Sequence, residues 1–495
     1  MYFEQFYLTC LAHASYMIAS EGVAVVVDPQ RDVDIYLDEA ARNGFEIAYV
    51  VETHLHADFV SGHRELVVRA PGRGSKIYVS SRAGAQFPHV PVKDGDELRF
   101  GRCVLRFIET PGHTPESICL LVTDLDRSPE PWAVLTGDTL FIGDVGRPDL
   151  SPEFTPQQLA ALLYRSLHQK LLSLPDQVEV YPAHGAGSLC GRNISPERRS
   201  TIGKERAFNY ALRPMSEDEF VRLLTSDLPE RPDYFARDAE INRSGASALG
   251  ELPPLPAFSP HQVARHQSEG ALVLDTRPAA QFGAGHVPGA INIGLSGQYA
   301  SWAARLLGLD QPLILVVEDP GRLQESRMRL ARVGMEKVIG YLEGGVLAWE
   351  KAGLPLRQTP QISVLELNEQ LCDVPSELQL LDVRNPGEWQ AGHIEQAAHI
   401  PLDQLRSAVS AGASLQTGPL ARVALDPSKA LAVHCKSGYR SSIAASLLER
   451  AGFFQVMNVV GGFDAWQTQK LPAVTRPPAC AASVEPASKV SGQSR

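Results

Sequence analysis

The stretch Thr53-His54-Leu55-His56-Ala57-Asp58 brings two imidazoles and two kinds of oxygen-bearing side chain into one short run of the chain. It follows the β-type run Ile47–Glu52, so it is predicted to form a loop at the end of a strand. Side chains on such a loop can converge on one point. Imidazole and carboxylate groups are the usual ligands of zinc and iron in proteins. The stretch therefore predicts a metal site.

Two further histidines stand in tight turns after β-type stretches, and an aspartate lies between them in the sequence. His113 lies in Thr110-Pro111-Gly112-His113-Thr114, Asp138 in Thr136-Gly137-Asp138-Thr139, and His184 in Tyr181-Pro182-Ala183-His184-Gly185. A single histidine of this kind is more often a structural or surface residue. The ordered set of turns indicates one shared metal centre.

These motifs resemble those of the metallo-β-lactamase superfamily, over residues 1 to about 225. The resemblance implies an αββα sandwich with metal at the edges of its sheets. It also implies that Asp28, in Val26-Val27-Asp28-Pro29, is a buried carboxylate that supports the histidine loop.

Phe59 departs from the pattern of the two-zinc hydrolases of this superfamily, which carry a histidine there that helps to hold a second metal. Phenylalanine cannot bind a metal, so one metal is favoured over two. His63 lies four residues further on and could face the same side if a helix begins here. Replacement of the lost ligand by His63 therefore stays open.

Within the superfamily, the N-terminal segment resembles the persulfide dioxygenases most. Their single Fe(II) ion is held by residues that correspond here to His54, His113 and Asp138. Two histidines and one carboxylate leave about half of an octahedron open for dioxygen and substrate. The other polar residues of the motifs then become supporting groups or second-metal ligands: His56, Asp58 and His184. Spacing alone does not separate one Fe(II) ion per chain from zinc.

The segment Gly143-Asp144-Val145-Gly146-Arg147-Pro148-Asp149 resembles the loop near the metal in the same family. Two roles stay open for Arg147: contact with an anionic thiol substrate, and an ion pair with Asp149.

An internal duplication organises the C-terminal half. Leu274-Asp275-Thr276-Arg277 recurs as Leu381-Asp382-Val383-Arg384, and Leu342-Glu343-Gly344-Gly345 recurs as Val459-Val460-Gly461-Gly462. In each copy β-type runs alternate with helical stretches, which is typical of a parallel sheet covered by helices. The repeated aspartate and arginine are expected to hold the fold in both copies.

The second copy carries Leu431-Ala432-Val433-His434-Cys435, followed by Lys436-Ser437-Gly438-Tyr439-Arg440. Both copies resemble rhodaneses, in which the catalytic cysteine heads a loop that closes at the start of a helix. The N–H groups of such a loop and the helix dipole favour a thiolate or a bound sulfur oxyanion. The resemblance makes Cys435 the sulfur carrier, with positive charge from Lys436 and Arg440. The rest of the loop is expected to contact substrate: Ser437, Gly438 and Tyr439.

Loop length favours sulfur transfer, because Cys435 to Arg440 span six residues and the phosphatase relatives of rhodaneses have one more. The matching segment of the first copy, Leu315-Val316-Val317-Glu318-Asp319, has Asp319 in place of the cysteine. Aspartate cannot carry sulfane sulfur, so this copy is expected to be non-catalytic. It would then be a spacer, a docking surface or part of the interface with the metal domain.

Length and composition limit the number of domains, the kinds of partner and the cellular compartment. A chain of 495 residues suggests about three domains. The net charge of -11 gives no reason to expect nucleic acid or an anionic membrane surface as partner. Seven scattered cysteines, all but Cys435 interpreted as packing residues, disfavour a disulfide scaffold and indicate a reducing compartment. Without a basic leader or a run long enough to span a bilayer, the chain is expected in the cytoplasm.

The predicted fold class is α/β multidomain: an αββα sandwich followed by two rhodanese-type parallel-sheet domains. A helix over 216–224, opened by Ser216 and Glu219, closes the first domain. The predicted segments are a metal domain (1–225), a proline-rich linker or extended arm (226–258), a module without catalytic cysteine (259–357), a module with Cys435 (361–474) and a disordered tail (475–495).

These expectations combine into a two-step sulfur enzyme. At iron, glutathione or coenzyme A persulfide would react with dioxygen and water to give thiol and sulfite. At Cys435, sulfane sulfur would be passed on, with thiosulfate as product or donor. A zinc-dependent thioester hydrolase of the glyoxalase II type and a non-enzymatic binding module are the rivals. The thiol carrier, the direction of transfer and the oligomeric state, including a homo-oligomer, stay open.

Overall fold

The computed structural model describes residues 1–70, 74–226, 228, 230–373, 378–409, 423 and 425–475. Its contacts divide the chain into two compact units, residues 1–257 with 295–341 and residues 258–294 with 342–495. None of the helices in the described ranges is both long enough and apolar enough to cross a bilayer. The predicted tail 475–495 lies outside the described residues, apart from its first position.

Two six-stranded sheets form the N-terminal part, in the orders β1-β2-β3-β4-β5-β6 and β14-β13-β10-β9-β8-β7. The first contains β1 (Tyr2–Leu8), β2 (His13–Ser20), β3 (Val23–Val27), β4 (Glu46–Val51), β5 (Lys76–Ser80) and β6 (Val90–Val92). The second contains β7 (Glu97–Phe100), β8 (Cys103–Glu109), β9 (Ile118–Asp124), β10 (Ala133–Gly137), β13 (Glu179–Pro182) and β14 (Ser200–Thr201). A small hairpin, β11 (Leu140–Phe141) with β12 (Asp144–Val145), follows β10.

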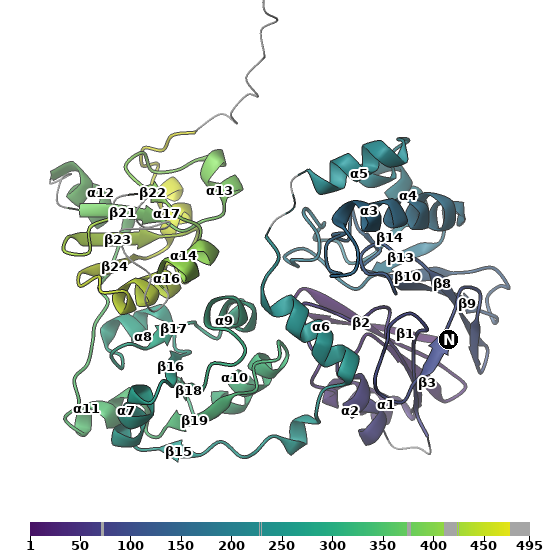
Figure 1. Ribbon diagram of the computed structural model, residues 1–495, viewed down its shortest axis with the longest axis horizontal. Helices are drawn as coiled ribbons and strands as arrows, with labels where there is room; N and C mark the ends of the chain where they lie inside the picture. Colours follow the sequence, from purple (N-terminus) through teal and green to yellow (C-terminus); the bar gives the residue numbers. More distant parts are fainter. Residues whose placement is uncertain are drawn as a thin grey trace, which may run out of the picture. The chain divides into compact units, whose positions relative to one another are not determined.

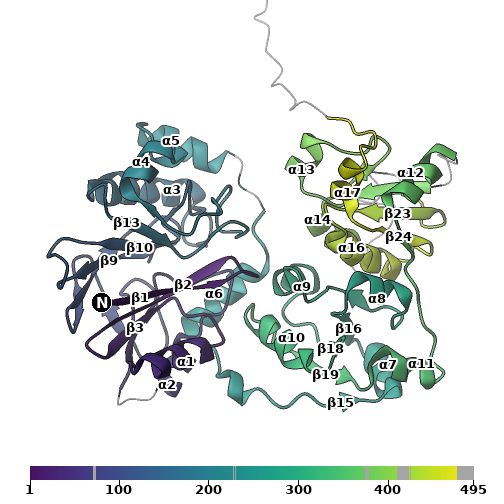
Figure 2. The same ribbon diagram turned by 180° about the vertical axis from the view of Figure 1, so that it is seen from behind.

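Three apolar cores show how these sheets are layered. One core joins the facing sides of the two sheets. A second lies between the first sheet and α1 (Asp34–Asn43) with α2 (His63–Arg69), and a third between the second sheet and α3 (Pro156–Arg165) with α5 (Glu217–Thr225). Figure 2 shows α1 and α2 on one side of the sandwich and α3, α4 (Ile202–Phe208) and α5 on the other. The predicted αββα sandwich is confirmed.

Helix ends follow sequence rules in several places. Ser216 caps α5, and its hydroxyl accepts the Glu219 N–H at 3.2 Å, as the sequence predicts. A π-helical turn, Ser166–Lys170, continues α3 and has no counterpart among the sequence predictions.

The segment 226–258, predicted to be a linker or an extended arm, contains a helix in its middle part. Tyr234–Ser244 forms a helix, α6 (Figure 1). Asn242, which is 1% exposed, donates from its amide nitrogen to the carbonyls of His56 and Phe59, both at 2.7 Å, and accepts the Ser61 N–H at 2.8 Å. These contacts and the buried aromatic residues of α6 stabilise the helix against the metal loop. The prolines near it in the sequence led to the prediction of a linker.

The duplicated half contains two five-stranded sheets of the same topology, β15-β19-β18-β16-β17 and β20-β24-β23-β21-β22. The first is built from β15 (Ala257–Phe258), β16 (Leu272–Asp275), β17 (Ile291–Asn292), β18 (Leu313–Val316) and β19 (Val338–Leu342). The second is built from β20 (Gln361–Ile362), β21 (Leu378–Asp382), β22 (Ala398–His399), β23 (Ala430–His434) and β24 (Val456–Val459). The strand pairs that carry the two repeats are parallel, which confirms the rhodanese-type architecture.

Helices alternate with these strands. The first copy has α7 (Pro260–Ser268), α8 (Ala279–Ala284), α9 (Tyr299–Leu307), α10 (Arg322–Ala331) and α11 (Gly345–Lys351). The second has α12 (Val364–Asp373), α13 (Pro386–Ala391), α14 (Leu402–Val409), α16 (Tyr439–Arg450) and α17 (Gly462–Thr468). In Figure 1, α12 and α17 lie on one face of the second sheet and α16 on the other, so both faces of the sheet are covered.

Candidate metal centre and cysteine loop

The loop after β4, which carries His54, is held in place by Asp28. This aspartate is 1% exposed and has a left-handed backbone with φ of 50°. Its Oδ1 accepts the Thr53 N–H at 2.7 Å, and its Oδ2 accepts the Thr53 hydroxyl at 2.8 Å. The Thr53 hydroxyl proton is used in the bond to Asp28. Thr53 Oγ1 therefore accepts a hydrogen bond from His54 Nδ1–H, which lies 3.0 Å away. His54 therefore presents an unprotonated Nε2.

His54, His113 and Asp138 meet from the loops that follow β4, β8 and β10. Asp138 Oδ2 lies 3.8 Å from His54 Nε2 and 3.3 Å from His113 Nε2, and one ligand atom from each residue lies within 4.8 Å of the others. All three side chains are buried. Among the described residues, His113 Nε2 and Asp138 Oδ2 have no hydrogen-bond partner. Buried polar atoms of this kind normally have partners, so the arrangement fits a cation between them.

The electrostatics of the three residues agree with that assignment. Burial, helped by His56, holds the pKa of His54 well below its usual value, and burial also lowers the pKa of His113. Burial alone would raise the pKa of Asp138, but the neighbouring His184 and the other imidazoles lower it well below its usual value. Two neutral imidazoles and an ionised carboxylate are the donor set of a divalent metal.

His113 is oriented by the loop that contains Arg147. Its Nδ1 donates to the Arg147 carbonyl at 2.9 Å, which leaves Nε2 for a metal. Gly146 makes this approach possible, because a Cβ there would lie 2.0 Å from the Asp138 carbonyl oxygen and 2.8 Å from His113 Nδ1. The Arg147 guanidinium binds both carboxylate oxygens of Asp149, at 2.7 and 2.9 Å. The ion pair is thus present, and a contact between Arg147 and substrate stays a prediction.

His184 lies between two carboxylates. Its Nδ1 is 2.8 Å from Asp138 Oδ1 and its Nε2 is 2.9 Å from Asp58 Oδ2. Burial would lower the pKa of His184, but Asp138 and Asp58 together raise it well above its usual value. His184 therefore orients the Asp138 carboxylate as a charged donor in this geometry.

The His56 ring lies beside that of His54, with centroids 4.1 Å apart, but its Nε2 lies near carboxylates other than Asp138. His56 Nε2 lies 3.2 Å from Asp28 Oδ1 and 3.7 Å from Glu52 Oε2. The Phe59 ring is fully buried and packs against His56, with ring centroids 4.4 Å apart. His63 does begin a helix, α2, but its Nδ1 lies 3.4 Å from Glu52 Oε1. The geometry thus ties His63 to Glu52 instead of placing it in the role of the missing second-metal ligand.

Two residues of the site were missed by sequence reasoning. Glu52 forms a buried group with Asp28 and His56, whose candidate ligand atoms lie within 4.8 Å of one another. Cys190 forms a similar group with Asp58 and His184. Burial, followed by the nearby Asp58, raises the pKa of the Cys190 thiol well above its usual value. Its place six residues after His184, in the same glycine-rich loop, was the only available indication.

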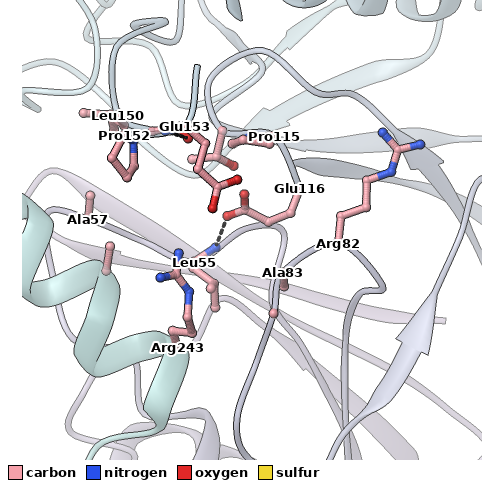
Figure 3. Close-up of a pocket in the computed structure, with 14 residues that line it drawn as sticks. Leu55, Ala57, Arg82, Ala83, Pro115, Glu116, Leu150, Pro152, Glu153 and Arg243 are labelled. Carbon is pink, nitrogen blue, oxygen red and sulfur yellow. Dashed lines mark hydrogen bonds between the residues drawn. The ribbon is translucent and has the colours of Figure 1, made fainter. Parts of the chain in front are cut away.

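A pocket of about 330 Å³ borders both histidine loops (Figure 3). Leu55 and Ala57 line it from the first loop, and Glu116 lines it just beyond His113. Glu116 is buried and accepts the Leu55 N–H at 3.1 Å, drawn as a dashed line in Figure 3. The volume is at the lower end of the range for small-molecule sites. Cationic and anionic side chains both line it: Arg82, Arg243, Glu116 and Glu153.

Cys435 heads the loop between β23 and α16. Its side chain is buried, and its Sγ accepts the Gly438 N–H at 3.1 Å. The loop backbone is anchored on the start of α17, where Phe463 N–H donates to the Cys435 carbonyl at 2.7 Å. The sulfur thus lies at a helix start with an N–H group aimed at it, an arrangement suited to binding a sulfur oxyanion.

Some of the other loop residues are exposed, and others form hydrogen bonds within the protein. Lys436 and Ser437 are exposed, whereas the Tyr439 hydroxyl donates to the Gly294 carbonyl at 2.8 Å. The Arg440 guanidinium forms two 2.7 Å bonds to the carboxylate of Glu388, a partner that the sequence did not indicate. Contact of these loop residues with substrate stays a prediction.

The first rhodanese-like copy has the same Asp–Arg pair as the second copy but lacks the nucleophilic cysteine. Arg277 binds the carboxylate of Asp275 and donates to the Gly285 carbonyl at 2.9 Å. Arg384 binds Asp382 in the same way, and donates to Gly392 at 2.7 Å. Asp319, in the position of the cysteine, is exposed, and its Oδ1 accepts the Gly321 N–H at 3.0 Å.

Comparison with known proteins identifies these parts. The metallo-beta-lactamase superfamily model matches residues 8–184, and the rhodanese-like domain model matches residues 259–352 and 363–469. The persulfide dioxygenase ETHE1 of Homo sapiens is 34% identical over 208 residues, which cover 41% of this chain and 70% of that protein. The chain belongs to the metallo-β-lactamase superfamily. It joins a domain with persulfide dioxygenase homologues to tandem rhodanese-like domains.

Two other comparisons bear on the branch of the superfamily. A metallo-beta-lactamase structure from Staphylococcus aureus is 31% identical, with a TM-score of 0.62, and the match covers 69% of this chain and 98% of that one. A hydroxyacylglutathione hydrolase of a Polaromonas strain is 29% identical, with 46% of this chain and 93% of that protein covered. The superfamily and its metal-binding fold are thus established, and relatives of two reaction types are similar to the N-terminal domain.

Proposed function

We propose that this chain oxidises a small-thiol persulfide with dioxygen at one Fe(II) ion and transfers sulfane sulfur at Cys435. The observation that carries the first part is the cluster of His54, His113 and Asp138. Two neutral imidazoles and one carboxylate direct their metal-binding atoms to a common point. This donor set suits an iron that keeps open positions for dioxygen and substrate. The persulfide dioxygenase relatives support the same reaction.

The overall reaction is RSSH + O₂ + H₂O → RSH + SO₃²⁻ + 2H⁺, in which the outer sulfur is oxidised and dioxygen is reduced. Bound Fe(II) would supply the electrons that activate dioxygen and a position for the persulfide sulfur. The chain's own residues hold and orient that ion: His113 through the Arg147 carbonyl, and Asp138 through His184. We assign the thiol carrier to the pocket of about 330 Å³ beside Leu55 and Glu116.

Sulfur transfer uses the loop after β23. The Cys435 thiolate attacks the outer sulfur of thiosulfate, the S–S bond breaks, and sulfite leaves as Cys435 becomes a persulfide. In the opposite direction sulfite accepts that sulfur and thiosulfate leaves. The Gly438 N–H, 3.1 Å from the sulfur, stabilises negative charge in both directions. Lys436, exposed beside it, adds attraction for sulfur oxyanions.

A zinc-dependent thioester hydrolase is the second candidate, favoured by one observation. Asp58, His184 and Cys190 form a second buried group with ligand atoms within 4.8 Å of one another. A second zinc there could generate a hydroxide nucleophile. Phe59 and the rhodanese-like domains favour the dioxygenase instead.

Metal reconstitution separates the two candidates. Full-length protein is loaded with either iron or zinc under anaerobic conditions and assayed for oxygen uptake with glutathione persulfide and for thioester hydrolysis. We expect oxygen uptake with iron alone and no thioesterase activity with either metal. Thioesterase activity with zinc, without oxygen uptake in the iron-loaded protein, would overturn the dioxygenase proposal. The Asp138→Asn variant should bind neither metal tightly.

A further inference from the structure

The end of α10, in the copy without a catalytic cysteine, belongs to the same compact unit as the metal loop. Arg332 is its C-cap residue. The Arg332 guanidinium donates to both carboxylate oxygens of Asp32, at 2.8 and 2.6 Å, and both side chains are less than one-fifth exposed. The Arg332 carbonyl accepts the Val60 N–H at 2.7 Å. Arg332 Nη1 also lies 3.5 Å from Cys10 Sγ, so one residue contacts three segments of the metal domain.

Two of these segments, the loops that contain Val60 and Asp32, lead directly to metal-site residues. Val60 is two positions after Asp58, and Asp32 is four positions after Asp28, which holds Thr53 and contacts His56. The loops also touch each other tightly. The Gly62 N–H donates to the Pro29 carbonyl at 3.0 Å, and a Cβ at Gly62 would lie 2.3 Å from the Gln30 carbonyl oxygen. Because the loops pack this closely at Gly62, we expect a shift of one to move the other.

The turn after α10 makes further contacts of the same kind. Glu336 accepts a hydrogen bond from the Arg31 guanidinium at 2.9 Å, and the Arg31 side chain is 1% exposed. Gly334, with φ of 69°, packs so closely on α6 that a Cβ there would lie 2.5 Å from Asp238 Oδ1. The turn 332–336 thus contacts the metal domain through ion pairs and through close packing at Gly334.

We propose that the rhodanese-like copy without cysteine is a positioning element of the metal site. Its turn 332–336 holds the loops 28–32 and 54–61, and through them the orientation of His54. This assignment rests on the metal site of the proposed function but not on which metal it holds or which substrate it oxidises. It gives the cysteine-less copy a role in metal retention and turnover, in place of sulfur transfer.

The test uses full-length protein and the Arg332→Met variant, with Arg322→Met as matched control. Arg322 is the first residue of the same helix, is exposed and pairs with Glu325, three residues further along. The rate of metal loss to a chelator, the kcat and KM of oxygen uptake, and sulfur transfer at Cys435 are measured. For Arg332→Met we expect metal loss to be about 10- to 100-fold faster and kcat to fall, with KM and sulfur transfer unchanged. Arg322→Met should match the wild type.

A charge exchange provides the rescue. Asp32→Arg combined with Arg332→Asp should restore slow metal loss, because the two groups can pair in the opposite sense. Metal loss from Arg332→Met as slow as from the wild type would overturn the proposal. So would a parallel fall in metal retention and sulfur transfer, since that indicates general unfolding. Absence of oxygen uptake in the wild type, with metal loss still accelerated in Arg332→Met, would instead overturn the proposed reaction and leave this inference standing.

Discussion

At the residue scale, Cys435 combines a buried sulfur with a hydrogen bond from the Gly438 N–H at 3.1 Å. Serine at this position keeps the size but cannot hold sulfane sulfur. We expect Cys435→Ser to lower the rate of sulfur transfer from thiosulfate to cyanide by about a thousandfold or more. The rate of oxygen uptake should be unchanged. Both rates are measured on one preparation. Loss of oxygen uptake as well would show that the two sites do not work independently.

The pair of Glu388 and Arg440 gives a prediction about pH. Burial would raise the pKa of Glu388, but Arg440 lowers it below its usual value. A lowered pKa stabilises the fold above the unfolded-state pKa of about 4.3, and this contribution is lost as pH falls through the folded-state value. We expect Glu388→Gln to cost about 1 kcal/mol at pH 7 and progressively less in acid. Urea unfolding of both proteins from pH 7 to below the folded-state pKa of Glu388 checks this, and a pH-independent difference would contradict it.

At the scale of elements, the glycine pair at the start of α17 (Gly461 and Gly462) can be compared with the pair at the start of α11 (Gly344 and Gly345). Gly462 and Gly345 both have left-handed φ, 54° and 60°. A Cβ at Gly462 would lie 2.3 Å from the Cys435 carbonyl oxygen, whereas a Cβ at Gly345 has nothing within 4 Å. We expect both alanine variants to lose about 1 kcal/mol from backbone strain. Only Gly462→Ala should also displace the cysteine loop and lower sulfur transfer, by about tenfold or more.

Sulfur-transfer rates and thermal unfolding of the two glycine variants separate the two effects. Equal losses of transfer in Gly345→Ala and Gly462→Ala would indicate that strain alone, without the steric contact at Cys435, accounts for the loss.

Elements differ in how far the sequence predicts them. The strands before His54 and Cys435 follow from their apolar runs, and Ser216 correctly predicts the start of α5. Helix α6 was missed, because its stability comes from buried contacts such as those of Asn242, which no local pattern reveals. The pairing of Glu388 with Arg440 was missed for the same reason: these residues are far apart in sequence.

At the scale of the whole molecule, the fold class was predictable because duplication and ordered metal motifs persist over long stretches of chain. The choice of His54, His113 and Asp138 came from the resemblance to the persulfide dioxygenases; the structure brings the three together, and their binding of a metal stays a prediction. The position of Cys190 beside Asp58 could not be predicted from the sequence, because the fold brings these two distant residues together. The contact of Arg332 with Asp32 joins segments 300 residues apart, and no motif marks it.

The central claim is a single-iron persulfide dioxygenase, and its stoichiometry tests it most directly. Iron-loaded full-length Cys435→Ser protein, in which sulfite cannot be diverted through the cysteine loop, is given limiting glutathione persulfide in a closed oxygen electrode. The account predicts one dioxygen consumed and one sulfite formed per persulfide, with one iron per chain, and no uptake in the zinc-loaded protein. Persulfide loss without oxygen uptake, or equal activity with zinc, would contradict it.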